Sequence, residues 1–307
     1  MPLRAGCSDV SLPAMNIRAG AVTREKPPFR AEHVGSLLRP KGLLQKRERF
    51  SRGEISRAEL TTAEDAAISD ALALQKRLGL RFVTDGEFRR CSYHSFFYQQ
   101  LGELTIDTVA GVDAKGGAAG AGRGQQPIAL VKSRVKWTHP INVADFNFLK
   151  SRTRLLPKIT IPGPCALHFR GGDAAVLAHA YHDIAQFWDD TVEAFESELV
   201  ALAQAGCRYV QIDETAFAKF GDPDVQAALA ARGDDWSKLI DTYIAITNRV
   251  LRKRVEEANR HVALDRLAVS PQCGFASVDT GNPVTPEVQE AKLRLVVELA
   301  DDIWGEA

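Results

Sequence analysis

Short apolar runs alternate with long segments of helical periodicity over most of the chain. The runs predict strands at 28–40, 81–87, 157–164, 207–215 and 267–273, with a further β-like segment at 128–137. Helices are expected at 59–80, at about 236–259, at 286–304 and in the stretch between 164 and 207. This alternation is typical of parallel strands joined by helical crossovers.

Two of the expected helices carry apolar stripes. In 59–80 the stripe is Ala67, Ala71, Leu74 and Leu78, and Thr61 with Glu64 is predicted to form the capping box. The helix before 207 has its stripe at Ile184, Trp188, Val192, Phe195, Leu199 and Leu202. Both sets repeat at helical spacing, so each set shares one face of its helix.

Polar and conformationally special residues gather where the predicted strands end. They are Gly35-Ser36, Asp85-Gly86-Glu87, Pro162-Gly163-Pro164, Asp213-Glu214 and Cys273-Gly274. In a (β/α)8 TIM barrel the carboxyl ends of the strands form one mouth, where the active site lies. A doubly wound sheet would gather ligands near a single switch point, so five decorated strand ends favour the barrel. The glycine motifs that cradle nucleotide phosphates are absent from the sequence.

Composition limits the partners of this chain of 307 residues. It is 45% hydrophobic, enough for one sizeable core, and its 39 basic and 39 acidic residues balance. This predicts no nucleic-acid or membrane partner, and no apolar run is long enough to span a bilayer. Five scattered cysteines (Cys7, Cys91, Cys165, Cys207 and Cys273) indicate reduced thiols and a cytoplasmic location. Residues 1–27 lack the apolar region of a secretory signal and are expected to form a flexible tail.

The strand ends offer several candidates for chemistry. Cys273 could be a thiolate metal ligand or nucleophile, or simply a small buried residue. Glu87 and Asp213 could bind an amine or act as acid and base, whereas either alone could be a helix cap or part of a structural ion pair. Cys165 and His168 have a spacing found in zinc sites, but no second pair lies near them in the sequence.

Several segments together resemble the cobalamin-independent methionine synthase family, in its short single-barrel branch. They are "FRAEHVGSLLRP", "TDGEFRR", "TIPGPCALHFRGG", "YVQIDE" and "LAVSPQCGFAS". The resemblance runs from about residue 28 to the C-terminus and implies one barrel domain over 28–307, related to uroporphyrinogen decarboxylase. It further implies a methyltransferase that moves a methyl group from 5-methyltetrahydrofolate to homocysteine, whose sulfur zinc holds as a thiolate. A neutral thiol is a poor nucleophile, and zinc deprotonates it near neutral pH.

The resemblance also implies residue roles. Cys273 matches the zinc cysteine of the family's last strand. Glu87 and Asp213 match acidic residues that hold the amino group of homocysteine, and these two are the predicted catalytic residues. Gly35 and Ser36 lie in the turn that matches the one meeting the carboxylate of the amino acid, where backbone N–H groups and a hydroxyl suit an anion.

The chain departs from the family pattern between Asp213 and Ser270. The family supplies a His-x-Cys pair and a glutamate there as further zinc ligands, and this chain has no His-x-Cys. The long helical segment resembles two family helices joined at about 250–254, so roughly two or three βα units are predicted to be missing and the barrel incomplete. One thiolate does not make a tetrahedral zinc site.

Two other functions therefore remain open at the sequence level. One is a non-catalytic pseudoenzyme or binding subunit that has lost its zinc site. The other is a different thiol alkyltransferase or a uroporphyrinogen decarboxylase-like enzyme. For the decarboxylase-like enzyme, the arginines near the mouth that would grip carboxylates are Arg39, Arg89, Arg90 and Arg170. The thiol at Cys273 argues against metal-free decarboxylation, which has no need of it.

Overall fold

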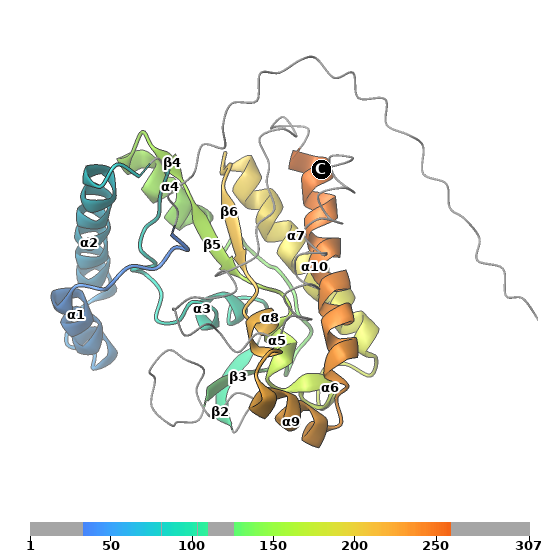
Figure 1. Ribbon diagram of the computed structural model, residues 1–307. Coiled ribbons are helices and arrows are strands. Elements are labelled where there is room, and N and C mark those ends of the chain that lie inside the picture. The colour runs from blue at the N-terminus through green and yellow to red at the C-terminus, as the bar shows by residue number, and fades with distance from the viewer. Residues whose placement is uncertain (1–32, 81, 103, 110–125, 259–307) are drawn as a thin grey trace, which may run out of the picture. The chain divides into compact units, whose positions relative to one another are not determined.

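The computed structural model describes residues 33–80, 82–102, 104–109 and 126–258 (Figure 1). Within these ranges the helices are α1 (Lys41–Ser51), α2 (Arg57–Arg77), α3 (Ser95–Tyr98), α4 (Val143–Arg152), α5 (Ala166–Phe169), α6 (Gly172–Leu177), α7 (Ile184–Gln204), α8 (Ala216–Lys219), α9 (Pro223–Arg232) and α10 (Trp236–Ala258). The strands are β1 (Phe82–Val83), β2 (Thr105–Val109), β3 (Gln126–Leu130), β4 (Leu156–Pro157), β5 (Ile159–Pro162) and β6 (Val210–Asp213).

The segment 156–162 is the central element of a parallel arrangement. Its first part, β4, pairs with β1, and its second part, β5, pairs with β6, both in parallel. The change of partner occurs between two neighbours: the Lys158 N–H donates to the Val83 carbonyl at 2.8 Å, and the Ile159 N–H donates to the Tyr209 carbonyl at 3.0 Å. The carboxyl ends of β1, β5 and β6 therefore lie at one edge, as in an α/β barrel.

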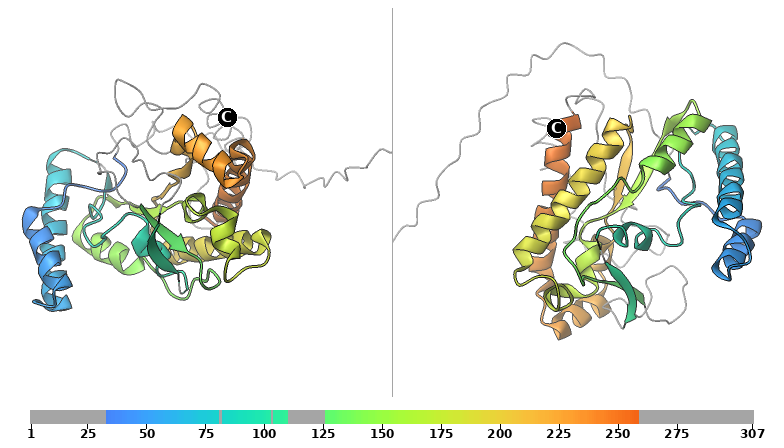
Figure 2. Two further views of the ribbon diagram at one scale, coloured as in Figure 1. Left: turned by 90° about the horizontal axis from the view of Figure 1, so that it is seen from below. Right: turned by 180° about the vertical axis from the view of Figure 1, so that it is seen from behind.

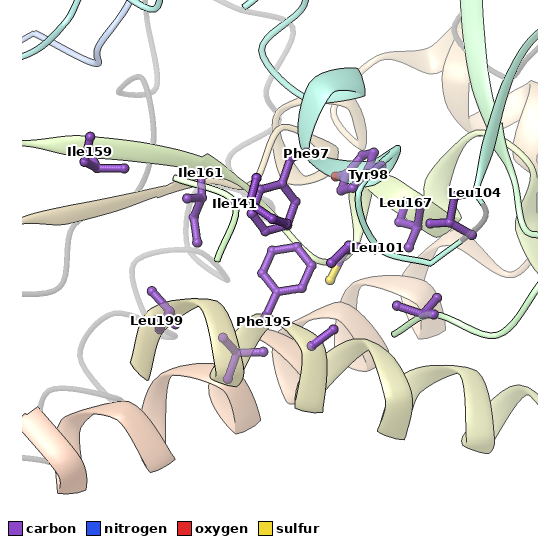
Figure 3. Close-up of a cluster of buried hydrophobic side chains, with 14 of the residues drawn as sticks. Phe97, Tyr98, Leu101, Leu104, Ile141, Ile159, Ile161, Leu167, Phe195 and Leu199 are labelled. Carbon is purple, nitrogen blue, oxygen red and sulfur yellow. The ribbon is translucent and has the colours of Figure 1, made fainter. Parts of the chain in front are cut away.

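Helix α7 connects β5 to β6 and supplies much of the core. Five of its six predicted stripe residues are buried (Trp188, Val192, Phe195, Leu199 and Leu202), and Ile184 is partly buried against them, which confirms the predicted face. Figure 3 shows Phe195 pointing from α7 toward Phe97, and their ring centres are 5.1 Å apart. Figures 1 and 2 show α10 alongside α7, where Trp188 meets Tyr243 at 5.9 Å between ring centres.

The start and face of α2 differ from the prediction. The capping box is formed by Ser56 and Glu59, whose backbone N–H groups and side-chain oxygens bond reciprocally at 3.2 and 2.8 Å. Glu64 is instead buried beneath three arginines of other turns and elements, Arg57, Arg89 and Arg47, at 3.2, 3.5 and 3.6 Å. Of the predicted stripe, Ala67 and Ala71 are buried as expected, whereas Leu74 and Leu78 are 38% and 69% exposed. Ile68 and Leu72 are buried as well, so the core-facing side of α2 is shifted from the predicted one.

Two further expectations differ from the structure, and others concern residues that the structure does not describe. Residues 33–40 form no strand, and this segment instead lies against the loop after β1, where the Leu37 N–H donates to the Gly86 carbonyl at 3.1 Å. The β-like segment at 128–137 contributes only its start, in β3, which pairs with β2 as an antiparallel hairpin. The predicted strand at 267–273, the final helix, the glycine-rich loop at 111–127 for most of its length, and the tail 1–27 lie outside the described residues.

In the described part of the chain, no helix is long and apolar enough to cross a membrane. The described architecture is α/β, with parallel strands separated in sequence by helices, which is consistent with a TIM-barrel-like domain. The domain limits of 28–307 and the missing βα units stay predictions.

Candidate functional site

The loop after β1 brings Glu87 against Gly35. Thr84 donates its hydroxyl to the Gly35 carbonyl at 2.6 Å, which fixes the 33–36 segment beside the strand end. A Cβ on Gly35 would lie 2.8 Å from Glu87 Oε1 and 2.5 Å from the Thr160 methyl carbon. Only a residue without a side chain allows this approach, so glycine is required here by contact. Gly35 is buried, and the neighbouring Ser36 is exposed.

Glu87 has a strained backbone. Its φ of 60° is the one positive φ recorded for a non-glycine residue in the described ranges, and a side chain there costs about 1–2 kcal/mol. Its N–H donates to Asp85 Oδ1 at 2.9 Å, and Arg39 Nη2 donates to its carbonyl at 3.0 Å. Such strain persists only where surrounding contacts hold it, and it is concentrated at functional sites.

The Glu87 side chain is buried within a polar cluster. Its Oε1 accepts the Thr160 hydroxyl at 2.8 Å, and Arg90 Nη1 lies 3.8 Å from the same oxygen. Thr160 lies in the middle of β5, so the central strand supplies a direct contact to the carboxylate after β1. The loop after β1 and the strand β5 thus fix one oxygen of Glu87.

Asp213 is the last residue of β6 and lies opposite Pro162 of β5. It is 5% exposed, and Gln211 Nε2 donates to its Oδ1 at 2.6 Å. Burial raises the pKa of Asp213 to about 6; the hydrogen bond from Gln211 opposes this, and the negative charge of Glu87 adds to it. The negative charge of Glu87 thus disfavours ionisation of Asp213, whereas the positive charges of Lys158 and Arg90 favour it.

The next residue, Glu214, joins two strand ends. Its Oε2 accepts the Cys165 N–H at 2.8 Å and its Oε1 accepts the Ala216 N–H at 3.1 Å. A Cβ on Gly163 would lie 2.6 Å from Glu214 Cα, so the turn after β5 passes directly over this residue. Burial raises the pKa of Glu214 to about 7, against the effect of these backbone donors. Glu214 therefore links the end of β6 to the turn after β5 through its hydrogen bond with Cys165.

In the structure the side chains of Cys165 and His168 have partners other than a metal ion. The Cys165 thiol is fully buried, lies 3.6 Å from the Tyr243 carbonyl and 3.7 Å from Thr247 Oγ1, and has a pKa raised well above its usual value by burial. Both ring nitrogens of His168 are already bonded, Nδ1 to Tyr243 at 2.7 Å and Nε2 to Asp173 at 2.8 Å. Both side chains are thus committed to packing and hydrogen bonding.

The residues that the structure covers contain no group of three or more His, Cys, Asp or Glu side chains arranged for a metal ion. The described residues therefore do not fit a zinc centre by themselves. Cys273, the metal ligand predicted from the sequence, lies outside the described residues. Its role stays a prediction.

Four of the five predicted strand ends fall within the described ranges, and the structure brings them together. Gly35 contacts Glu87, and Gly163 contacts both Glu214 and the Asp213 carbonyl, to which its N–H donates at 2.9 Å. Sequence reasoning did not find Thr160, and it named Arg90 only as one of four arginines near the mouth that could grip carboxylates. A threonine within an otherwise apolar strand is not a specific signal without the fold.

With this geometry established, comparison with known proteins gives a family. Residues 30–237 match the family described as the catalytic domain of the cobalamin-independent synthase. The chain belongs to this family. The resemblance found in the sequence is thereby confirmed, and by family the chain is of an enzyme type.

Several relatives share this family's sequence and fold. The uncharacterized protein YxjG of Bacillus subtilis is 31% identical over 374 residues, covering 92% of this chain and 97% of that protein. A 5-methyltetrahydropteroyltriglutamate–homocysteine methyltransferase of Halalkalibacterium halodurans is 26% identical, and the match covers 68% of this chain and 25% of that protein. A crystal structure from Listeria monocytogenes, provisionally described as a vitamin B12-independent methionine synthase, has 28% identity and a TM-score of 0.56, covering 92% of this chain and 100% of that one.

Proposed function

We propose that this chain is a methyltransferase of the cobalamin-independent methionine synthase type. Its methyl donor is 5-methyltetrahydrofolate, as the polyglutamate, and its acceptor is the thiolate of homocysteine. The observation that carries the proposal is the pair of buried carboxylates, Glu87 and Asp213, at the ends of the two strands that flank segment 156–162. The family supports the reaction class, and the partners are small molecules in the cytoplasm.

The carboxylate pair suits an α-amino group. Glu87 already has the Arg90 guanidinium 3.8 Å away, and an ammonium group near both carboxylates would add a positive charge that reduces their mutual repulsion. Asp213 and Glu87 therefore hold the amine, and the Gly35-Ser36 turn receives the carboxylate of the same amino acid. Because Gly35 contacts Glu87, the two ends of an α-amino acid find their partners side by side.

Binding the amino end orients the thiol for reaction. In the family, zinc stabilises the thiolate of homocysteine, and Cys273 is the residue of this chain that would hold the zinc ion. The family's other ligands, the His-x-Cys pair and the glutamate, have no counterpart in the sequence. The residues at the strand ends contribute orientation and charge. They hold the sulfur in line with the methyl group that it attacks, which lowers the entropic part of the barrier.

The test is calorimetric titration with L-homocysteine and with 4-mercaptobutanoate, which is the same molecule without its amino group. Asp213→Asn keeps the shape and removes the charge. We expect it to weaken homocysteine binding by about 10- to 100-fold, the worth of a hydrogen bond to a charged group, and to leave 4-mercaptobutanoate within about twofold.

The pH dependence of homocysteine binding provides a second test of the contact between Asp213 and the ammonium group. Because the pKa of Asp213 is about 6, its carboxylate is protonated below that pH and loses its attraction for the ammonium group. The Kd for homocysteine should rise about tenfold from neutral pH to about pH 5. In Asp213→Asn this rise should disappear. Asp241→Asn, on the exposed surface of α10, is the matched control and should behave as wild type in both measurements.

Equal losses for the two ligands in Asp213→Asn would refute the role of this carboxylate. Binding of 4-mercaptobutanoate as tight as that of homocysteine to wild type would refute an amine site altogether.

A second function is supported by the length of the relatives. The 374 aligned residues of the YxjG comparison exceed the 307 residues of this chain, so YxjG has residues without a counterpart here. This supports the missing segment and the incomplete barrel predicted from the sequence, and with them an amino-acid-binding relative that does not turn over. Methionine formation from 5-methyltetrahydrofolate and homocysteine, measured by mass spectrometry with added zinc, separates the two. Binding without methionine would favour the binding protein.

A further inference from the structure

A buried guanidinium lies behind the Glu87 carboxylate. Arg90 is 2% exposed, and its Nη1 donates to Thr160 Oγ1 at 2.9 Å while its Nη2 donates to the Thr160 carbonyl at 2.8 Å. Nη1 also lies 3.8 Å from Glu87 Oε1. Burying an arginine is costly unless its charge is compensated, so this residue is held here by specific partners.

The direction of the hydrogen bonds follows from the donors available. A guanidinium only donates, so the Thr160 oxygen must accept from Arg90. The threonine hydroxyl has a single hydrogen, and the remaining partner within reach is Glu87 Oε1 at 2.8 Å. Arg90 thereby commits the Thr160 hydrogen to the carboxylate. The chain of donors runs one way, from Arg90 through Thr160 to Glu87.

The far side of Arg90 is fixed to the core. Its Nη2 reaches Asn142 Oδ1 at 3.3 Å, and Asn142 in turn donates its side-chain amide and its backbone N–H to Glu198 Oε1 at 3.1 and 2.7 Å. Glu198 belongs to α7 and is fully buried. The Phe96 ring covers the guanidinium at 4.3 Å. Arg90 is thus rigid, and what it holds is rigid too.

We propose that Thr160 and Arg90 are positioning residues that aim the Glu87 carboxylate at the bound amine. This inference rests on the proposed function of Glu87. With Oε1 held by Thr160, the rotation of the carboxylate is set, and the second oxygen is presented to the ligand. Preorganised charge of this kind binds more tightly because no ordering is needed when the ligand arrives.

The first experiment measures ligand selectivity by calorimetry in three variants. Thr160→Val removes the hydroxyl and keeps the shape, Thr160→Ser keeps the hydroxyl, and Thr191→Val is the matched control, since Thr191 on α7 is buried and its Oγ1 has no hydrogen-bond partner among the described residues. We expect Thr160→Val to weaken homocysteine binding about tenfold and to leave 4-mercaptobutanoate within about twofold.

The other two variants distinguish an effect of the Thr160 hydroxyl on Glu87 from a general effect of changing a buried threonine. Thr160→Ser should restore homocysteine affinity to within about threefold of wild type, and Thr191→Val should leave both ligands unchanged. Equal weakening of the two ligands, or a Thr160→Val variant that binds homocysteine as tightly as Thr160→Ser, would overturn the proposal.

The second experiment needs no ligand. Thermal unfolding is measured for Thr160→Val, Glu87→Met and the double variant, since methionine has a similar shape and no oxygen to accept the Thr160 hydroxyl. If Thr160 acts through Glu87, the Tm loss caused by Thr160→Val should be about 3 °C or more in the wild-type background and clearly smaller beside Glu87→Met. Additive losses would show that the hydroxyl does not act on the carboxylate. Wild-type protein that binds neither ligand would refute the proposed function, and this cycle would still decide whether Thr160 holds Glu87.

Discussion

Replacing Asp213 by asparagine should make the protein more stable at neutral pH. The carboxyl is 5% exposed, and burial together with the charge of Glu87 raises its pKa from 3.8 to about 6. Each pKa unit corresponds to about 1.4 kcal/mol, so ionised Asp213 costs the folded state roughly 3 kcal/mol. Asparagine cannot ionise and can still accept the hydrogen bond from Gln211.

The pKa of Asp213 is raised on folding, and this direction sets the pH range over which the group changes the stability of the protein. Between pH 3.8 and about 6 the folded protein keeps the proton of Asp213, whereas the unfolded chain releases it. Rising pH therefore favours unfolding across this window, and the stability that the protonated group allows is lost by the time the pH passes about 6. The advantage of Asp213→Asn should be small near pH 4, grow through the window and stay constant above it.

Urea unfolding of both proteins at several pH values between about 4 and 7.5 gives this difference directly. The acids that do not interact with Asp213 titrate alike in both proteins, so their effect cancels in the comparison. Asp241→Asn should show no pH-dependent difference, because that residue is exposed. A variant less stable than wild type at neutral pH, or an advantage independent of pH, would refute the argument that Asp213 is kept at a cost in stability.

Two further changes test other parts of the site. Gly163→Ala should destabilise the protein by about 1–3 kcal/mol in urea unfolding, because its Cβ would lie 2.6 Å from Glu214 Cα; Gly42→Ala, at an open position in α1, should instead be neutral or stabilising, and equal effects would contradict the packing. Cys273→Ala should abolish zinc in the purified, dialysed protein, because the resemblance makes Cys273 a zinc ligand; zinc per chain measured by mass spectrometry and unchanged from wild type would exclude it.

The buried face of a helix was predicted correctly where local apolar spacing defines it, and incorrectly where contacts from other elements define it. The stripe on α7 was predicted correctly because all six residues are large or branched apolar residues at one spacing. On α2 two successive Ser/Thr-to-Glu pairs, Ser56 with Glu59 and Thr61 with Glu64, compete as caps, and local sequence does not distinguish them. Glu64 is buried because Arg47 and Arg89, from outside α2, lie against it, and Leu74 is exposed because none of the described elements covers it.

The candidate site was partly predictable for a geometric reason. Parallel strands end at a common edge, so carboxylates that follow strands, such as Glu87 and Asp213, were expected to converge. The contacts that hold them were not found. Thr160 lies within an apolar strand, and Arg90 was expected only as one of several arginines at the mouth. Their contacts span distances in sequence that no local pattern encodes.

The central position of 156–162 has a consequence for how the protein folds. This segment forms its hydrogen bonds with chain on both sides of it, β1 synthesised earlier and β6 synthesised later. Glu87 and Asp213 therefore become neighbours only after the last of the three strands has docked. A cationic ligand held by both would bind the completed arrangement and none of its precursors, and would stabilise it in proportion to the logarithm of ligand concentration. A ligand present during synthesis would therefore favour the docked arrangement of the three strands over its precursors.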